Sequence, residues 1–178
     1  MEWILYADNY ILDFIQRVFR CDILDFVMPY ITLLGENGIL WIILGISLLF
    51  YKKTKPMGIS ILMALMIGFV ICNLTLKPLV ARVRPYDANG FEGLLVKALS
   101  DYSFPSGHTL ASFEMAVCVY MFDKKYGIIA LIIAALIGFS RLYLYVHYPS
   151  DVIFGAVLGI FIGYFSSYIV NKRFSQCS

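Results

Sequence analysis

Residues 152–170 of the chain read VIFGAVLGIFIGYFSSYIV, a run of nineteen residues without a charged side chain. A helix needs about 20 predominantly apolar residues to cross the hydrocarbon core of a bilayer. This run is bounded by Asp151 before it and by Lys172 and Arg173 shortly after it. The stretch therefore predicts a transmembrane helix, and it sets the fold class of the whole chain.

Four further apolar runs precede this one, at 38–51, 57–76, 109–122 and 127–145. The shorter runs reach crossing length only with neighbouring residues, helix tilt or local thinning of the bilayer. The segment from Ile23 to Leu34 is brief and carries Asp25 and Pro29, so it is either a sixth, broken span or a re-entrant piece. We predict an all-α, polytopic bundle of about six transmembrane helices.

The composition agrees with a membrane protein of one domain. The chain has 178 residues, of which 61% are hydrophobic, and its mean hydropathy is +0.80, which is more apolar material than a soluble core of this size needs. We expect a single membrane-embedded domain over residues 1–178. The formal net charge of only +2 argues against a nucleic-acid partner, and the four scattered cysteines lack the spacing of a zinc site.

The first segment, residues 1–20, mixes acidic residues with aromatic and aliphatic ones and lacks the uninterrupted apolar run of a signal peptide. An amphipathic helix that lies in the membrane interface fits this pattern. The expected organisation is an interfacial helix over 1–20 followed by a transmembrane bundle over 23–171.

Basic residues orient the bundle, because lysine and arginine near the ends of spans favour the cytoplasmic side. If the spans alternate, three basic groups share one face, which is then cytoplasmic: Lys52, Lys53 and Lys55; Lys124 and Lys125; Lys172 and Arg173. The opposite, external face then receives several cations against this bias, together with both histidines and Asp151. A bound anion at the external mouth of the bundle explains their presence.

The first polar cluster on that face contains Lys77 and Arg84, which is followed by Pro85. Seven residues turn a helix through about 700°, so both cations can face one side of a continuous helix. Pro78 disturbs such a helix, and a short new helix that starts near it is an equal alternative. Taken alone, the two cations also suit a helix end that reaches lipid headgroups.

The second cluster is Pro105-Ser106-Gly107-His108, which stands just before an apolar run. Serine is a good N-cap and glycine lets a ligand approach the backbone, so this is either an ordinary helix start or an anion site. Free amides at a helix start bind phosphate through hydrogen bonds and the helix dipole.

The third cluster joins Ser140-Arg141 to His147 and Asp151 at the junction of two predicted spans. Asp151 follows His147 by four residues, so its carboxylate can accept from one ring nitrogen and leave the other as a free lone pair. Such a histidine is a nucleophile. The alternative is a buried ion pair that ties the two helices together.

Two histidines and an aspartate also suggest a metal. The cations Lys77, Arg84 and Arg141 oppose a divalent cation and complement a phosphate. We therefore expect no metal and no other cofactor.

The three clusters together resemble the signature of the type 2 phosphatidic acid phosphatase family, which shares an active-site plan with vanadium haloperoxidases. The first motif of that family, lysine, six residues and Arg-Pro, is matched from Lys77 to Pro85. The Pro-Ser-Gly-His motif is matched from Pro105 to His108. The third, Ser-Arg, five residues, histidine, three residues and aspartate, is matched from Ser140 to Asp151.

The resemblance implies a role for each matching residue. His147 is the implied nucleophile that becomes a phosphohistidine, Asp151 orients it, and His108 is the general acid that protonates the leaving group. The phosphoryl oxygens are implied to be held by Lys77, Arg84, Ser106, Gly107 and Arg141.

Members of the family act on phosphatidic acid, phosphatidylglycerophosphate, sphingolipid phosphates and polyprenyl diphosphates. The short chain resembles the small bacterial members, which implies a multi-pass cell-membrane enzyme with an external active site, a lipid phosphate as substrate and membrane lipids as its surroundings. Some undecaprenyl pyrophosphate phosphatases of the family carry aspartate at the position of Gly107, so broad lipid-phosphate hydrolysis is favoured over a dedicated carrier phosphatase. A non-catalytic anion or lipid transporter is the alternative of another class. The oligomeric state does not follow from the sequence.

Overall fold

A computed structural model describes residues 2–175 of the chain; Met1 and residues 176–178 lie outside the described part. Helices make up this range and no strand occurs in it. The elements run as follows: α1 (Glu2–Phe19), α2 (Asp22–Leu33), η1 (Glu36–Gly38), α3 (Ile39–Leu49), α4 (Lys55–Phe69), η2 (Val70–Leu76), α5 (Lys77–Val80), α6 (Pro85–Asn89), α7 (Gly107–Phe122), α8 (Lys124–Tyr143) and α9 (Pro149–Ser175).

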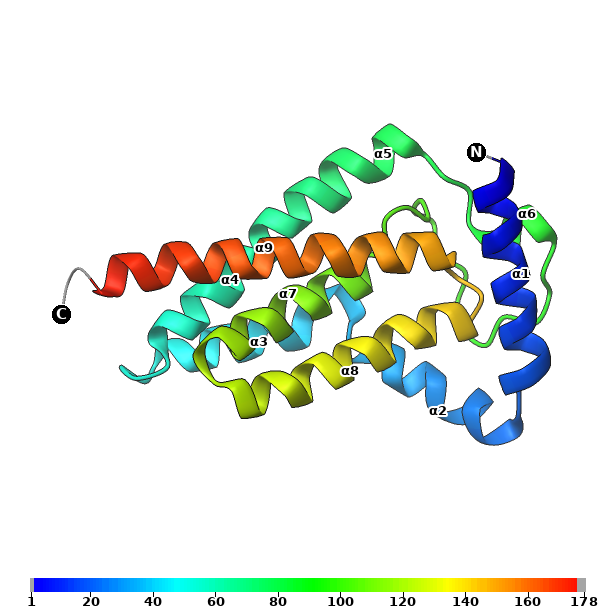
Figure 1. The fold of residues 1–178 in the computed structure, drawn as a ribbon. Helices are drawn as coiled ribbons and strands as arrows, with labels where there is room; N and C mark the ends of the chain where they lie inside the picture. The colour runs from blue at the N-terminus through cyan, green and yellow to red at the C-terminus, as the bar shows by residue number, and fades with distance from the viewer. Residues whose placement is uncertain (1, 176–178) are drawn as a thin grey trace.

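The long helices run nearly parallel and antiparallel to one another and form an elongated bundle (Figure 1). Within the described residues, four helical segments are long and apolar enough to cross a membrane: Asp22–Leu49, Lys55–Asn89, Lys124–Tyr143 and Pro149–Phe174. Helix α7 makes one further pass between the second and third of these segments. It is shorter and lies in the middle of the bundle, where α4, α8 and α9 pack against it. The all-α bundle expected from the apolar runs is confirmed.

The segment expected as a broken sixth span or a re-entrant piece, Ile23–Leu34, forms α2 and leads directly into α3 (Figure 1). The two helices follow one another along one pass, and the 3-10 turn η1 separates them. Asn37 and Gly38 adopt left-handed backbone conformations there, with φ of 50° and 65°, which end the helix before α3 starts afresh. Ile23–Leu34 is therefore the first half of one interrupted pass, and it does not cross separately.

The α7–α9 contact depends on glycines spaced four residues apart on α9. A Cβ added to Gly159 meets the carbonyl oxygen of Leu110 at 2.6 Å, and one added to Gly163 meets that of Glu114 at 2.6 Å. Gly155 approaches the backbone of Ser106 in the same way. Small residues at this spacing let helix backbones come close in membranes. This seam fixes the start of α7 against the start of α9, where two of the polar clusters lie.

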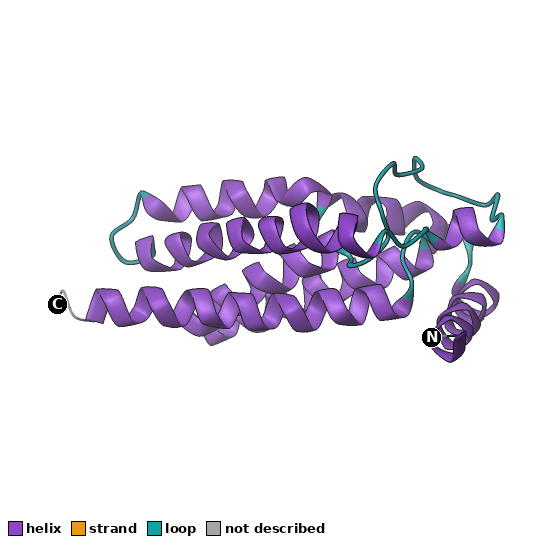
Figure 2. Ribbon diagram, turned by 90° about the horizontal axis from the view of Figure 1, so that it is seen from above, coloured by secondary structure: helices purple, strands orange, loops and turns teal. Residues whose placement is uncertain are grey.

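The N-terminal helix α1 lies across one end of the bundle, roughly perpendicular to the long helices (Figure 2). Its buried residues are Asp8, Leu12 and Ile15, whereas Trp3, Tyr6 and Tyr10 are exposed. A helix with an apolar exposed side at the end of a transmembrane bundle suits the membrane interface. The interfacial segment over 1–20 and the transmembrane bundle over 23–171 stay predictions.

The three basic groups used for orientation gather at the other end. They belong to the α3–α4 turn, the start of α8 and the end of α9, which all lie at the end of the bundle opposite α1 (Figure 1). The polar clusters lie at the α1 end. The separation of the two sets of cations along the bundle thus agrees with the expected alternation of the spans.

Candidate active site

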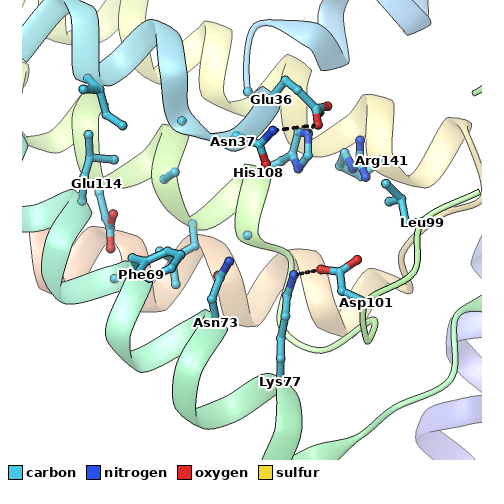
Figure 3. A pocket seen from close by; sticks show the side chains of 18 of the residues that line it. Glu36, Asn37, Phe69, Asn73, Lys77, Leu99, Asp101, His108, Glu114 and Arg141 are labelled. Atoms are coloured by element: carbon cyan, nitrogen blue, oxygen red, sulfur yellow. Dashed lines mark hydrogen bonds and ion pairs between the residues drawn. The ribbon is translucent and has the colours of Figure 1, made fainter. Parts of the chain in front are cut away.

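A cavity of about 680 Å³ opens among α3, α4, α7 and the loop before α7. Its polar residues come from all three clusters, and Figure 3 shows several of them pointing toward one another. Its remaining wall is apolar and comes mainly from the middle of the bundle. The polar lining consists of Glu36, Asn37, Asn73, Lys77, Arg84, Ser100, Asp101, His108, Glu114, Arg141 and His147, and the apolar lining includes Ile42, Leu62, Leu65, Met66, Phe69, Leu110 and Ala111.

The first cluster reaches the cavity through a change in backbone conformation. Helix α4 continues as the π-helix η2 and then as α5, which has Pro78 in its first turn. Ala81 is left-handed, with φ of 49°, and Arg84 is extended. Of the two alternatives, the short helix beginning near Pro78 is closer to the structure, although Arg84 lies beyond its end.

Lys77 and Arg84 meet at one carboxylate, that of Asp101. Lys77 Nζ forms an ion pair with Asp101 Oδ2, and Arg84 Nη2 donates to Asp101 Oδ1 over 2.6 Å. Asp101 belongs to the loop between α6 and α7. A loop carboxylate thus lies between the two cations that were expected to hold a phosphate.

His147 lies in the α8–α9 connection and is 1% exposed. Its Nδ1 is 3.6 Å from Asp151 Oδ2 and 3.5 Å from Ser103 Oγ. Ser103 Oγ itself donates to Asp151 Oδ2 over 2.5 Å, and the Tyr148 amide donates to the same oxygen over 3.0 Å. Asp151 Oδ2 therefore lies near Nδ1 but beyond hydrogen-bond distance, and Ser103 Oγ approaches both groups.

The other ring nitrogen of His147 faces the cations. Its Nε2 is 3.2 Å from Arg84 Nη1. A guanidinium only donates, so Nε2 must be the accepting nitrogen and the ring proton of the neutral form belongs on Nδ1. The free lone pair is consequently on Nε2, at the edge of the cavity.

Arg82 supports Asp151 from the opposite side. Its Nη1 donates to Asp151 Oδ1 over 2.5 Å, its Nη2 donates to Asp8 Oδ2 over 2.7 Å, and its guanidinium lies 3.8 Å from the centroid of the Tyr148 ring. Asp8 also accepts from the amide and the hydroxyl of Ser150. A chain of charges therefore links His147 through Asp151 and Arg82 to helix α1.

Arg141 is 2% exposed and lines the cavity. Its Nη1 donates to Thr32 Oγ1 over 2.5 Å, while Nε and Nη2 have no hydrogen-bond partner among the residues that the structure describes. Buried polar groups are almost always paired. Two unpaired guanidinium donors at a cavity wall indicate a place for an anion.

The second cluster forms the start of α7. Ser106 is the N-cap, but its Oγ contacts Thr109 Oγ1 at 2.9 Å, and its amide donates to the Asp151 carbonyl over 3.2 Å. Gly107 lines the cavity, and the Nζ of Lys77 lies 3.8 Å from the position of an added Cβ. His108 lines it too, with Nε2 3.2 Å from Glu36 Oε2 (Figure 3).

Electrostatics keep the His147 imidazole neutral when no anion is bound. Burial lowers the pKa of His147 well below its ordinary value, and Arg84, Arg141 and Lys77 lower it further. Burial opposes ionisation of Asp101, but Lys77 and Arg84 outweigh it and bring its pKa to about 2. The cavity is thus a cationic site in which His147 is free to accept a proton or a bond.

Residues 2–175 contain no group of three or more His, Cys, Asp or Glu side chains placed to hold a metal ion. Of the three carboxylates that line the cavity, Glu36 and Asp101 are paired with His108 and with cations, and Glu114 lies apart from them on α7, with no hydrogen-bond partner among the described residues. The donors present therefore suit an anion better than a divalent cation.

Three contributors were not identified from the sequence, namely Glu36, Asp101 and Ser103, and the sequence assigned no role to Arg82. Ser103 stands three residues before Ser106 and Asp101 stands five residues before it, so proximity to the Pro-Ser-Gly-His motif was a usable signal. Glu36 interrupts an apolar stretch between two glycines, Gly35 and Gly38. An ionisable residue in such a stretch is a functional signal.

Comparisons with known proteins agree with this geometry. Residues 57–175 match the PAP2 superfamily model. The chain is 33% identical to an undecaprenyl-diphosphatase of Sulfolobus acidocaldarius over 80% of this chain and 69% of that one. It is 36% identical to phosphatidylglycerophosphatase B of Bacillus subtilis over 78% of this chain and 71% of that one.

Two solved structures are similar in fold. The crystal structure of a transmembrane PAP2 type phosphatidylglycerolphosphate phosphatase from Bacillus subtilis superposes with a TM-score of 0.80 at 30% identity, over 97% of this chain and 88% of that one. Aquifex aeolicus LpxE gives a TM-score of 0.70 at 29% identity, over 90% and 94% of the two chains. The family model covers the three polar clusters and both histidines, and the chain therefore belongs to the PAP2 superfamily.

Proposed function

We propose that this PAP2-superfamily membrane phosphatase removes the terminal phosphate of a lipid phosphomonoester or diphosphate through a phosphohistidine on His147. The observation that carries the proposal is the pairing of a nucleophile with an anion site. The His147 Nε2 lone pair lies at the edge of a cavity where Arg84, Lys77 and the two unpaired donors of Arg141 converge. Phosphoryl transfer needs positioning and a preorganised positive cage more than added covalent machinery.

In the first step, the Nε2–P bond forms as the bond from phosphorus to the leaving oxygen breaks. The proton on Nδ1 stays beside Asp151 and Ser103, which stabilise the charge that develops on the ring. The leaving oxygen takes a proton from His108, so the products are a free lipid alcohol, or a lipid monophosphate, and phosphohistidine. In the second step a water oxygen attacks phosphorus, the P–N bond breaks, and the water proton goes to His108.

The phosphate-binding set follows from the same arrangement. Lys77, Arg84 and Arg141 supply positive charge, and Gly107 leaves open space beside Lys77 at the start of α7. Ser106 is assigned to this set by its motif, and its contacts with Thr109 and Asp151 show that it also fixes the helix start. A bound phosphate displaces Asp101 from Lys77 and Arg84, because both anions require the same cations.

The apolar wall of the cavity suits a lipid tail. Side chains from α3, α4 and α7 continue from the cations toward the middle of the bundle, as Phe69 illustrates in Figure 3. The headgroup end lies at the α1 end of the bundle, opposite the three basic groups. Given the preference of basic residues for the cytoplasm, this arrangement supports a reaction at the external face of the cell membrane.

The relatives named above act on two kinds of substrate by their names, a polyprenyl diphosphate and phosphatidylglycerophosphate. We propose broad lipid-phosphate hydrolysis, with a dedicated undecaprenyl-diphosphate phosphatase as the narrower alternative. Gly107 supports the broad assignment, because a carboxylate added at this position would approach Lys77 Nζ and compete with a phosphate oxygen.

The test is phosphate release by detergent-purified protein, with a chelator present, from phosphatidic acid, phosphatidylglycerophosphate and undecaprenyl diphosphate. The proposal predicts release from more than one lipid, unaffected by the chelator and abolished in His147→Ala. Release from the diphosphate alone supports the narrower assignment. Release by His147→Ala, or dependence on a divalent metal, contradicts the proposed mechanism.

A further inference from the structure

His108 has one carboxylate partner among the described residues, and it comes from a distant part of the chain. Its Nε2 lies 3.2 Å from Glu36 Oε2, and the two residues are 72 positions apart. The His108 side chain is 14% exposed and that of Glu36 is 42% exposed. This contact joins η1 to the first turn of α7 and belongs to none of the three sequence motifs.

The turn that carries Glu36 is built to hold it beside the imidazole. It interrupts the apolar pass of α2 and α3, and Asn37 and Gly38 adopt left-handed conformations in it. A Cβ added to Gly35 meets His108 Cδ2 at 3.1 Å and Ile137 Cγ2 at 3.1 Å, so the turn packs directly on the ring. Non-helical backbone within a membrane bundle is tolerated where it lines a cavity, and η1 lines this one.

The other ionisable groups around His108 are positive or become so on protonation. They are Arg141 from α8, His147 from the α8–α9 connection, Lys77 at the start of α5 and Arg84 before α6. Asp101 from the neighbouring loop also lines the cavity, but its carboxylate is bound to Lys77 and Arg84. Glu36 is thus the anion in direct contact with the ring, and it counteracts a cage that otherwise disfavours an imidazolium.

We propose that Glu36 is a positioning residue that orients His108 and keeps it protonated when the lipid phosphate is bound. This inference rests on the proposed function, because it assigns a partner to the general acid of that mechanism. A carboxylate accepts, so Nε2–H of His108 donates to Glu36 and Nδ1 is the ring nitrogen that exchanges a proton with the substrate. The anionic substrate and Glu36 together favour the imidazolium.

The proton balance is simple. As the P–O bond breaks, the leaving oxygen takes the Nδ1 proton and the electron pair of that N–H bond stays on the ring, which becomes neutral. The Nε2–H bond to Glu36 is kept throughout. When water attacks phosphohistidine, its proton returns to Nδ1 and the imidazolium beside Glu36 is restored. Glu36 gains and loses no proton in the cycle.

The proposed role of Glu36 predicts that its loss slows the reaction of some substrates more than that of others. General acid catalysis matters for a poor leaving group such as a lipid alkoxide and matters little for p-nitrophenolate, which leaves without a proton. Glu36→Gln keeps the size of the side chain and removes its charge. We expect it to lower kcat for a short-chain phosphatidic acid by about tenfold to 100-fold, with a much smaller loss for p-nitrophenyl phosphate.

Three further variants distinguish this positioning role of Glu36 from a purely structural one. Glu92→Gln removes an exposed carboxylate from the loop before α7 and is the matched control. Glu36→Asp keeps the charge and is expected to recover part of the activity. The pair of Glu36→Gln and His108→Ala is expected to be no worse than His108→Ala alone, since both act on one proton transfer.

The deciding experiment measures both substrates across pH for the unaltered protein, Glu36→Gln and His147→Ala, each eluting as a monodisperse species. The basic limb of kcat for the phosphatidic acid is expected to move to lower pH in Glu36→Gln, because His108 loses its proton more easily. Equal losses of kcat for both substrates, or losses that add to those of His108→Ala, overturn the role of Glu36 and leave the proposed function standing. Activity retained by His147→Ala overturns the proposed function itself, and the role of Glu36 with it.

Discussion

Asp101 holds its carboxylate against the guanidinium of Arg84, with Oδ1 2.6 Å from Nη2, and its second oxygen pairs with Lys77. The side chain of Asp101 is 48% exposed, whereas that of Arg84 is 2% exposed. A half-exposed loop carboxylate therefore neutralises buried cations of the proposed phosphate site. Phosphate binding and loop displacement are linked by this contact.

Asp101→Asn should tighten the binding of inorganic phosphate, because the competing negative charge is gone. Half-exposed ion pairs are modest, so the expected drop in the inhibition constant is roughly two- to fivefold. The pKa of Asp101 is about 2, so the carboxylate stays ionised and the difference should persist unchanged from about pH 5 to about pH 8. Competitive inhibition by phosphate measures it. The control is Asp87→Asn, which changes an exposed aspartate of α6 and should leave the inhibition constant unchanged. Weaker phosphate binding by Asp101→Asn would contradict the prediction and show that Asp101 assists the site.

Arg82→Ala should slow the reaction without weakening substrate binding to the same degree. Arg82 bonds Asp151 on the side away from His147 and also bonds Asp8, so its loss leaves the orienting carboxylate free to shift. A misplacement of about 1 Å in a catalytic group can cost on the order of 100-fold in rate. We expect kcat to fall by that order with KM nearly unchanged. Arg20→Ala provides the control, since Arg20 bonds Gln16 and Gly93 outside the site. A change confined to KM would place Arg82 in substrate binding instead.

The pH dependence should show a nucleophile that stays unprotonated in mild acid. The pKa of His147 lies well below its ordinary value because of burial and the neighbouring cations. For p-nitrophenyl phosphate, kcat/KM should therefore stay level as the pH falls below about 6.5. The unfolded chain takes up a proton at His147 near that pH and the folded chain does not, so stability should fall as the pH falls. An acid limb near pH 6.5 in phosphate binding that disappears in His147→Gln would show that His147 titrates there, and it would contradict the assignment.

Gly159→Ala should destabilise the bundle. Its new methyl group would meet the Leu110 carbonyl oxygen at 2.6 Å, which forces α7 and α9 apart, and overpacking of this kind costs about 1–3 kcal/mol. Thermal unfolding in detergent checks the prediction. Val157→Leu, on the exposed side of α9, adds volume without this contact and should unfold at the temperature of the unaltered protein. If Gly159→Ala unfolds at the same temperature as the unaltered protein, the contact between α7 and α9 adjusts to the methyl group without loss of stability.

The sequence predicted the bundle well because hydrophobic length and period determine it. The run 152–170 lies within α9 and the run 57–76 lies within α4 and η2, since the bilayer selects such stretches directly. The break at 35–38 was harder to read. It depends on how η1 packs against His108 and Ile137, which are far away along the chain.

The site residues differ in the same way in how far the sequence predicts them. Lys77, Arg84, His108, Arg141, His147 and Asp151 were selected by spacing, and the structure brings them to one end of the bundle. Arg82 and Ser103 act through Asp151, and no local pattern marks such partners. Ser106 was expected to face phosphate, yet its hydroxyl contacts Thr109. This contact depends on the side-chain rotamer of the N-cap serine, which the Pro-Ser-Gly-His motif does not specify.

The most direct test of the account is to trap the covalent intermediate. Protein incubated briefly with a lipid phosphate labelled with ³²P and quenched in base should carry label that is stable to base and released by acid, as expected for a phosphohistidine. The account predicts label on His147 of the unaltered protein and none in His147→Ala. Phosphate release by a folded His147→Ala protein would contradict it.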